Sequence, residues 1–320
     1  MKNTIHNGDC LDVMKSMPDS CIDSIVTDPP YGIKFKNQKW DYSIPSAKYF
    51  SEMLRVSKPG ATMLCFGGTR TFHRMAVNIE DAGWYISDTI CWLYGQGFPK
   101  SLDVSYAIDK AAGKFGAVKQ NKVVGPIMER SKKRQNITLH EPNSEDSKQW
   151  YGWGTALKPA FEPIIVANKR IEGNYNENAI KHGVCGLWID GARIEDPKYS
   201  NSGIRRTSDG RWPANVIIDP VLTGQLESQH IGASKFFYCP KVSSRERAGM
   251  THSTMKPLRL IKYLCSLTKT PTGGTVMDPY AGTGTTAIAC MDTGRDYIVI
   301  ESDKNLYSEM KTRVESYENI

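Results

Sequence analysis

The stretch from Ser24 to Tyr31, with the sequence SIVTDPPY, constrains the fold of this chain more than any other segment. It opens with β-branched residues, which predict a buried strand, and the strand must end at the two prolines. Neither proline has an N–H for a sheet, and each restricts the residue before it, so the backbone is held in one turn. The turn brings together the Asp28 carboxylate, the Pro29 carbonyl and the Tyr31 ring. They follow the carboxyl end of a strand, where open α/β sheets bind ligands.

A second informative stretch, residues 274–286 with the sequence GTVMDPYAGTGTT, lies near the end of the chain. Gly282 and Gly284 fit the G-x-G-x-x-G/A turn of nucleotide-binding folds. Glu301 ends the next predicted strand 19 residues after Gly282, where an acidic group accepts hydrogen bonds from ribose hydroxyls. A dinucleotide such as NAD and S-adenosylmethionine would both satisfy this pattern. A P-loop nucleotidase is excluded because the chain has no Gly-Lys-Ser/Thr.

The order of the predicted elements decides how the sheet is built. Strands are expected at residues 4–7, 22–27, 61–66, 86–93, 160–167, 275–277 and 297–300, and helices at 11–17, 46–57, 71–82, 258–268, 285–292 and 304–315. Only 19 residues follow Glu301, so the glycine turn must share a sheet with strands of the N-terminal half. We therefore predict an α/β fold: a Rossmann-like, doubly wound, circularly permuted sheet of seven mostly parallel strands.

The alternation of predicted strands and helices stops in the middle of the chain. The excess of basic over acidic residues that gives the net charge of +7 also lies there. Residues 110–150 carry 9 basic and 4 acidic groups, and residues 193–247 carry 9 and 6. A basic insert in a catalytic domain is typical of phosphate contact, although a solvated basic surface has the same composition. We predict a catalytic half at 1–94, an inserted recognition region at 95–250 with a returning strand near 160–167, and a cofactor-binding half at 251–320.

Cysteine and histidine usage argues against a metal or disulfide framework. The eight cysteines form no CxxC pair and sit mostly among apolar residues, as reduced core thiols do. The six histidines form no HExxH or Cys/His cluster, so we expect no metal. No leader peptide and no apolar run long enough to cross a bilayer are evident, which predicts a soluble, cytoplasmic protein.

The SIVTDPPY stretch and the DPYAGTGTT stretch together resemble the amino-methyltransferases, which methylate exocyclic amines of DNA bases with S-adenosylmethionine. Asp28, Pro29, Pro30 and Tyr31 match the catalytic motif of this family, and its beta subgroup has the same motif order. The sequence HSTMKP at 252–257 resembles another family motif, which faces the methionine end of the cofactor, with Ser253 in place of the commoner proline. The resemblance implies these cofactor-binding residues: Asp9, Cys10, Thr254, Lys256, Asp278, Tyr280, Gly282, Gly284, Thr285 and Glu301.

The implied reaction is methyl transfer from S-adenosylmethionine to the N6 amine of an adenine flipped out of double-stranded DNA, with Tyr31 as the stacking platform. Methylation of carbon 5 of cytosine needs a cysteine after proline, which this motif lacks. Cytosine-N4 methylation stays open, although that class more often has Ser at the position of Asp28. A nucleic-acid-binding relative without catalysis is the alternative from another class.

The expected partner is double-stranded DNA, in a bacterial cell or a phage-infected host and in the setting of restriction–modification. We predict that the following basic residues contact the DNA phosphates: Lys132, Lys133, Arg134, Arg205 and Arg206. A homodimer is compatible with the sequence, which leaves the oligomeric state, the recognition site and any restriction partner open.

Overall fold

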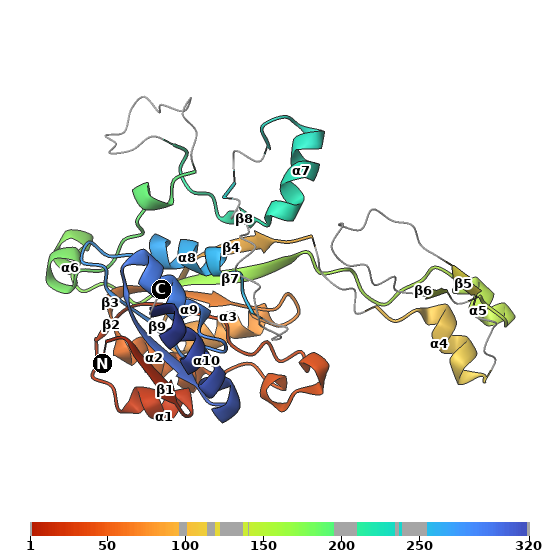
Figure 1. Ribbon diagram of the computed structural model, residues 1–320, viewed down its shortest axis with the longest axis horizontal. Coiled ribbons are helices and arrows are strands. Elements are labelled where there is room, and N and C mark those ends of the chain that lie inside the picture. The colour runs from red at the N-terminus through yellow and green to blue at the C-terminus, as the bar shows by residue number, and fades with distance from the viewer. Residues whose placement is uncertain are drawn as a thin grey trace. The chain divides into compact units, whose positions relative to one another are not determined.

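The computed structural model describes residues 2–95, 101–113, 119–121, 137–139, 141–194, 210–233, 237–238 and 255–318. The chain divides into two compact units, one formed by 1–95 with 161–320 and the other by 96–160. The larger unit contains a sheet whose strands come from both ends of the chain (Figure 1). The extent of the recognition region, 95–250, stays a prediction.

The sheet of the larger unit has eight described strands in the order β1-β10-β9-β2-β3-β7-β4-β8. Their bounds are Thr4–Asn7 (β1), Ile22–Thr27 (β2), Ser57–Phe66 (β3), Tyr85–Leu93 (β4), Phe161–Asn168 (β7), Val216–Ile218 (β8), Thr275–Asp278 (β9) and Asp296–Glu301 (β10). All neighbours pair in parallel except β7, which is antiparallel to both β3 and β4. The Rossmann-like, mostly parallel sheet is therefore confirmed.

The expected number of seven strands was wrong by one. All seven predicted strands are present, and the additional strand is β8, which pairs with β4 through Cys91↔Val216 to Leu93↔Ile218. Only three residues long, β8 lies in a region that we had assigned to recognition. Strand β3 also begins four residues earlier than predicted, at Ser57, because the Pro59-Gly60 pair is accommodated within it instead of ending a turn.

Helices cover both faces of the sheet. The helices α1 (Cys10–Lys15), α2 (Ala47–Val56) and α3 (Phe72–Asp81) pack on one face, and α8 (Leu258–Leu267), α9 (Thr285–Thr293) and α10 (Lys304–Glu318) on the other. Successive residues of β3 supply the two cores in alternation, since Met63 faces the first and Leu64 the second. Two further helices of this unit are α6 (Tyr175–His182) and α7 (Pro220–Gln229).

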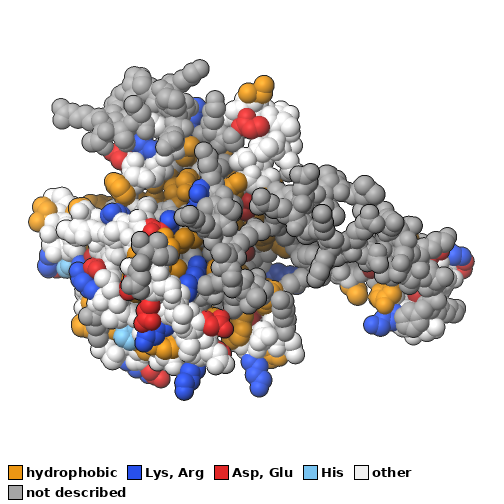
Figure 2. All heavy atoms as spheres, viewed as in Figure 1, with side chains coloured by type: hydrophobic (Ala, Val, Ile, Leu, Met, Phe, Trp, Pro, Cys, Tyr) orange, Lys and Arg blue, Asp and Glu red, His pale blue; other side chains and the backbone are white. Residues whose placement is uncertain are grey.

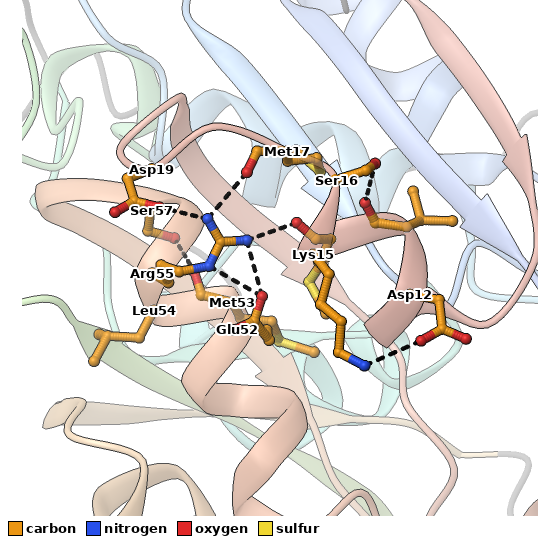
Figure 3. A network of polar contacts seen from close by, with 12 residues as sticks. Asp12, Lys15, Ser16, Met17, Asp19, Glu52, Met53, Leu54, Arg55 and Ser57 are labelled. Carbon is orange, nitrogen blue, oxygen red and sulfur yellow. Dashed lines mark hydrogen bonds and ion pairs between the residues drawn. The ribbon is translucent and has the colours of Figure 1, made fainter.

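Arg55, on the last turn of α2, joins α2 to α1 (Figure 3). Its guanidinium donates to the carbonyl oxygens of Met14 at 2.7 Å and Met17 at 3.0 Å, at the end of α1. It also pairs with Glu52 one turn back and with Asp19 in the connection. One side chain therefore ties the last turn of α2 to the end of α1 and to the connection that follows it.

The smaller unit contains α4 (Val104–Ala111), α5 (Glu145–Gln149), and the two-stranded antiparallel pair β5 (Lys119–Asn121) and β6 (Ile137–Leu139). The sequence had suggested only irregular structure here. Asp109 on α4 is buried and accepts from the Ser144 hydroxyl at 2.8 Å and the Asn143 N–H at 2.8 Å, which anchors the start of α5. Burial alone would raise the pKa of Asp109, but these hydrogen bonds lower it to about 2.

The surface of the larger unit carries side chains of both charges. Over the face seen in Figure 2, its Lys and Arg side chains are interspersed with Asp and Glu. In the part of the chain that the structure describes, no helix has the length and apolar character to cross a membrane.

Candidate active site

The carboxyl ends of five neighbouring parallel strands form one edge of the sheet, and the predicted site residues follow these ends. Asp9 comes after β1, Glu301 ends β10, Asp278 ends β9 and Asp28 follows β2. Adjacent strands lie about 4.8 Å apart, so Glu301 and Asp28, two strands apart, are separated by roughly 10 Å along the edge. The donor and acceptor halves predicted from the two motifs are thus side by side.

Tyr31 and Asp28 are hydrogen-bonded within the catalytic turn. The Tyr31 hydroxyl donates to Asp28 Oδ1 at 2.7 Å and also lies 3.0 Å from Glu162 Oε2. Burial first, and then the charges of Asp28 and Glu162, raise the pKa of the Tyr31 hydroxyl well above its usual value. Tyr31 is therefore a neutral donor at the pH of a cell.

Lys256 completes this cluster. Its ammonium lies 2.7 Å from Asp28 Oδ2, 3.1 Å from Glu162 Oε2 and 3.2 Å from the Tyr31 hydroxyl. It also lies 4.9 Å from the centre of the Phe66 ring, within cation–π range. Burial alone would lower the pKa of Lys256, but the charges of Asp28 and Glu162 outweigh it and raise that pKa. The resemblance implies a cofactor-binding role for Lys256, and the structure places its ammonium against the Asp28 carboxylate.

Sequence reasoning missed Glu162. It is the second residue of β7, and because β7 runs antiparallel to β3, its beginning lies at the edge where the parallel strands end. The Gly67 N–H donates to the Pro163 carbonyl at 2.9 Å, which fixes this start beside the end of β3. A carboxylate at the beginning of an otherwise apolar strand was the available signal, but the direction of the strand was not known.

Asp41, also missed, holds the loop that follows the catalytic turn. The side chain is 2% exposed and accepts four backbone N–H groups, from Tyr31, Gly32, Ile33 and Phe35, at 2.7 to 3.3 Å. The Tyr31 carbonyl in turn accepts from the Thr71 hydroxyl at 2.6 Å. Nothing in the local sequence pattern singled out Asp41, because its partners are backbone groups.

The Tyr31 ring packs closely against the backbone of Gly68. A Cβ on Gly68 would lie 3.0 Å from Cδ2 of Tyr31 and 3.2 Å from its Cβ. Contacts this short force one of the two groups to move. Gly68 follows β3, so this close approach sets the position of the ring at the sheet edge.

Asp278 binds the strand ends together. Its Oδ1 accepts from the Thr27 hydroxyl on β2 at 2.7 Å, and its Oδ2 accepts from the Thr286 hydroxyl on α9 at 2.6 Å. The side chain is 3% exposed, and burial raises its pKa to about 6. Both carboxylate oxygens of Asp278 therefore accept hydrogen bonds from within the protein. Through them, Asp278 fixes the position of the glycine turn relative to the turn after β2.

The glycine turn has the backbone that its sequence demands. Gly282 and Gly284 have φ angles of +54° and +77°, in the left-handed region. A Cβ on Gly284 would lie 2.7 Å from Met310 Cγ, so α9 and α10 pack too closely for a side chain here. At Gly282 no atom lies within 4 Å of such a Cβ, which leaves open space above the turn. Thr285, the first residue of α9, is buried and lies beside Thr283 and Arg313.

Glu301 reaches back to the glycine turn. Its Oε2 accepts from the Gly282 N–H at 3.0 Å, and its Oε1 from the Asp303 N–H at 2.8 Å. Burial is the main reason that its pKa is raised. Each oxygen keeps a second lone pair, so the carboxylate can accept ribose hydroxyls beside the open space at Gly282. This arrangement fits S-adenosylmethionine.

Asp9 and Cys10 begin α1 next to β10. The Asp9 carboxylate caps the helix by accepting from the Leu11 N–H at 2.8 Å. Cys10 is buried, hydrogen-bonded to Tyr280, and its pKa is raised by burial to about 12, so the thiol stays protonated. Cys10 and Tyr280 thus link the first strand–helix turn to the turn after β9.

Several predicted residues lie outside the described part of the chain. These are Thr254 and the predicted phosphate contacts Lys132, Lys133, Arg134, Arg205 and Arg206. Within the described ranges, no three His, Cys, Asp or Glu side chains are grouped so that they could hold a metal ion.

Known proteins are similar to this chain in sequence. Residues 22–312 match the sequence model of a family described as DNA methylase, the N6/N4 methyltransferases. The chain is similar to Type II methyltransferase M.HindIII of Haemophilus influenzae, with 21% identity over 96% of this chain and 94% of the relative. It is also similar to Type II methyltransferase M.BglI of Bacillus subtilis, with 23% identity over 99% of this chain and 86% of the relative.

Solved structures show the same fold. The PvuII DNA methyltransferase, a cytosine-N4-specific enzyme, matches with a TM-score of 0.51 and 12% identity, covering all of this chain and 91% of that one. A DNA modification methylase of Thermus thermophilus matches with a TM-score of 0.50 and 15% identity, covering 98% of this chain and 95% of that one.

Proposed function

The chain belongs to the N6/N4 DNA methylase family, and on that premise we propose that it methylates the N6 amine of adenine in double-stranded DNA. The observation that carries the proposal is the position of Asp28. Its carboxylate and the Pro29 carbonyl follow β2 at the sheet edge, next to the glycine turn that follows β9. They are two acceptors for the two hydrogens of an exocyclic amine.

S-adenosylmethionine supplies the methyl group as an electrophilic carbon on a sulfonium. The Gly282–Gly284 turn and Glu301 would bind it, the carboxylate accepting from the ribose hydroxyls. Bound there, it would donate its methyl group to the lone pair of the amine, and the electron pair of the broken C–S bond would stay on sulfur. The methylated nitrogen then loses one proton, which passes to Asp28 and on to solvent.

The adenine lone pair is delocalised into the ring, so the protein must favour a tetrahedral nitrogen. Hydrogen bonds to Asp28 Oδ2 and the Pro29 carbonyl would do this and would offset the positive charge that develops. Holding both reactants in line adds a larger share, because the step becomes unimolecular. The target base must first leave the duplex, and we propose that it stacks on Tyr31.

A carboxylate at position 28 supports adenine over cytosine, since the resemblance associates the cytosine-N4 class more often with Ser there. The charge of the smaller unit supports DNA as partner: residues 96–160 carry 11 Lys and Arg against 6 Asp and Glu, within a chain of net charge +7. The similarity to Type II methyltransferases supports a site-specific enzyme of restriction–modification.

Nucleoside mass spectrometry of DNA incubated with the full chain and S-adenosylmethionine tests the base assignment. We expect N6-methyladenine from the wild type and none from Asp28→Ala. N4-methylcytosine alone would overturn the base assignment and leave the family unchanged. Methylation-aware sequencing of the same DNA would give the recognition site, and size-exclusion chromatography would test for a homodimer.

DNA contact by the insert has its own test. Replacing Lys132, Lys133 and Arg134 together with Ala should weaken DNA binding and reduce the slope of its salt dependence by up to about three. Affinity for S-adenosylmethionine should stay the same. An unchanged salt slope would show that these residues do not contact phosphate.

A further inference from the structure

One ammonium is shared by two carboxylates at the catalytic turn. Lys256 Nζ lies 2.7 Å from Asp28 Oδ2 and 3.1 Å from Glu162 Oε2. The Lys256 side chain is only 12% exposed, and those of Asp28 and Glu162 are 27% and 21% exposed. The Tyr31 hydroxyl bridges the same two carboxylates from its own side, at 2.7 and 3.0 Å.

This arrangement conflicts with the chemistry proposed for Asp28. Its Oδ1 already accepts from Tyr31, and its Oδ2 accepts from Lys256. The target amine needs an acceptor on Asp28, and its nitrogen becomes positively charged as the methyl group arrives. A lysine cation at the same oxygen would repel that charge in a poorly solvated site. Each Asp28 oxygen keeps a second lone pair, so it is the charge of the ammonium that favours its moving away from Asp28 before transfer.

The Lys256 ammonium can move from Asp28 to the Glu162 carboxylate. Its Oε2 is already within 3.1 Å of the ammonium, so a small rotation of the lysine side chain exchanges one carboxylate for the other. The ammonium has three donors, and Glu162 and Tyr31 can retain two of them. Without Glu162, the cation would have no anion nearby other than Asp28 among the contacts described for it.

We propose that Glu162 is a positioning residue for methyl transfer, which holds the Lys256 ammonium while the target amine occupies Asp28. This inference rests on the proposed function. Two carboxylates and one ammonium carry a net charge of −1, which complements the single positive charge passed from sulfonium to amine. Before a base enters, the ammonium occupies the amine position, so that neither carboxylate is left in a poorly solvated site without a counter-charge.

Single-turnover methyl transfer by four proteins tests the proposal: the wild type, Glu162→Gln, Lys256→Met and the double variant. Glu162→Gln leaves the cation bound to Asp28, so transfer should slow by about tenfold or more, with S-adenosylmethionine affinity within about threefold. Removing the ammonium as well should restore part of the loss, so the double variant should be faster than Glu162→Gln. A purely structural ion pair predicts the reverse order, and that order would overturn the proposal.

Two further measurements make the test independent of how well one variant folds. Glu162→Asp keeps the charge and should transfer faster than Glu162→Gln, while Glu172→Gln, in an exposed pair with Lys181, should match the wild type. A crystal structure of the wild type with DNA and S-adenosylhomocysteine should show the ammonium on Glu162 and the amine at Asp28. An ammonium still on Asp28 beside a bound amine would contradict us.

The outcomes separate this inference from the proposed function. A wild type that transfers no methyl group to any DNA amine would overturn both. An active wild type with the wrong order of variants would overturn only the role of Glu162.

Discussion

Lys256 Nζ lies 2.7 Å from Asp28 Oδ2, although the two residues are 228 positions apart in the chain. The contact joins the segment before α8 to the turn after β2, so the two ends of the sequence meet at one carboxylate. On the proposed function, each end contributes part of the site, so neither the N-terminal nor the C-terminal half would hold donor and acceptor alone.

Asp28→Asn keeps the shape of the side chain and removes its charge. Turnover should fall by about a hundredfold or more, because the lost negative charge would offset the positive charge that develops on the amine in the transition state. Affinities for S-adenosylmethionine and DNA should stay within a few-fold. Single-turnover assays with calorimetry would measure both, and Asp12→Asn, in an exposed pair with Lys15, is the control. Near-normal turnover would show that Asp28 does not contact the amine.

Glu301→Gln should act on cofactor binding. The amide loses the charge that strengthens hydrogen bonds to ribose, and it also weakens the bond from the Gly282 N–H. We expect binding of S-adenosylmethionine to weaken by about 1–3 kcal/mol, measured by calorimetry. Glu315→Gln, on the exposed side of α10, should leave affinity unchanged. Equal affinities for the two variants would place the ribose elsewhere.

Gly284→Ala should lower the free energy of unfolding for two reasons, a φ of +77° and a Cβ 2.7 Å from Met310 Cγ. The combined loss should be about 2–4 kcal/mol in urea unfolding. Gly183→Ala is the matched control, because Gly183 has a φ of +72° with no atom within 4 Å of the added Cβ. It should show only the backbone strain, about 1 kcal/mol. Equal losses at both positions would mean that α10 moves to accommodate the methyl group.

Asp278 should make stability depend on pH. Its pKa in the folded protein, about 6, lies above the ordinary value of 3.8, so the folded protein holds a proton that the unfolded chain has released. The contribution of Asp278 to the free energy of unfolding is therefore full below pH 3.8 and is lost as the pH rises through 6. The loss is on the order of 3 kcal/mol.

Asp278→Asn lacks this titration, so its stability relative to the wild type should rise between about pH 4 and pH 7. Urea unfolding of both proteins at these two pH values would measure the change. A difference that stays constant across this range would mean that Asp278 ionises as freely in the fold as in the unfolded chain.

The turns after β2 and β9 could be predicted because their sequences restrict the backbone locally, whereas their catalytic and cofactor-binding roles stay predictions. Two prolines after an apolar strand, and glycines that need positive φ, leave few conformations. All seven strands of regular hydrophobic pattern were found because apolar and β-branched residues recur along them. The three-residue strand β8 was missed because a segment of that length has too little periodicity to recognise.

Glu162 and Asp41 could not be predicted because their roles depend on tertiary structure. Glu162 reaches the catalytic turn only because β7 runs antiparallel, and strand direction is set by the connection through residues 96–160. Asp41 accepts only backbone N–H groups, which every sequence offers. In the smaller unit, helices α4 and α5 were missed because short capped helices among polar residues resemble loops.

The pairing of Leu93 with Phe161 has a consequence for how such enzymes can diversify. These residues are direct partners at the ends of β4 and β7, and the smaller unit is the chain that runs between them. Its two points of attachment are thus about one strand spacing apart, roughly 5 Å. A segment whose ends meet so closely can be lengthened, shortened or exchanged without moving the strands that carry it. If the smaller unit contacts DNA as we propose, exchanging it at this hairpin tip would change sequence specificity and leave the sheet edge with Asp28 and Glu301 unaltered.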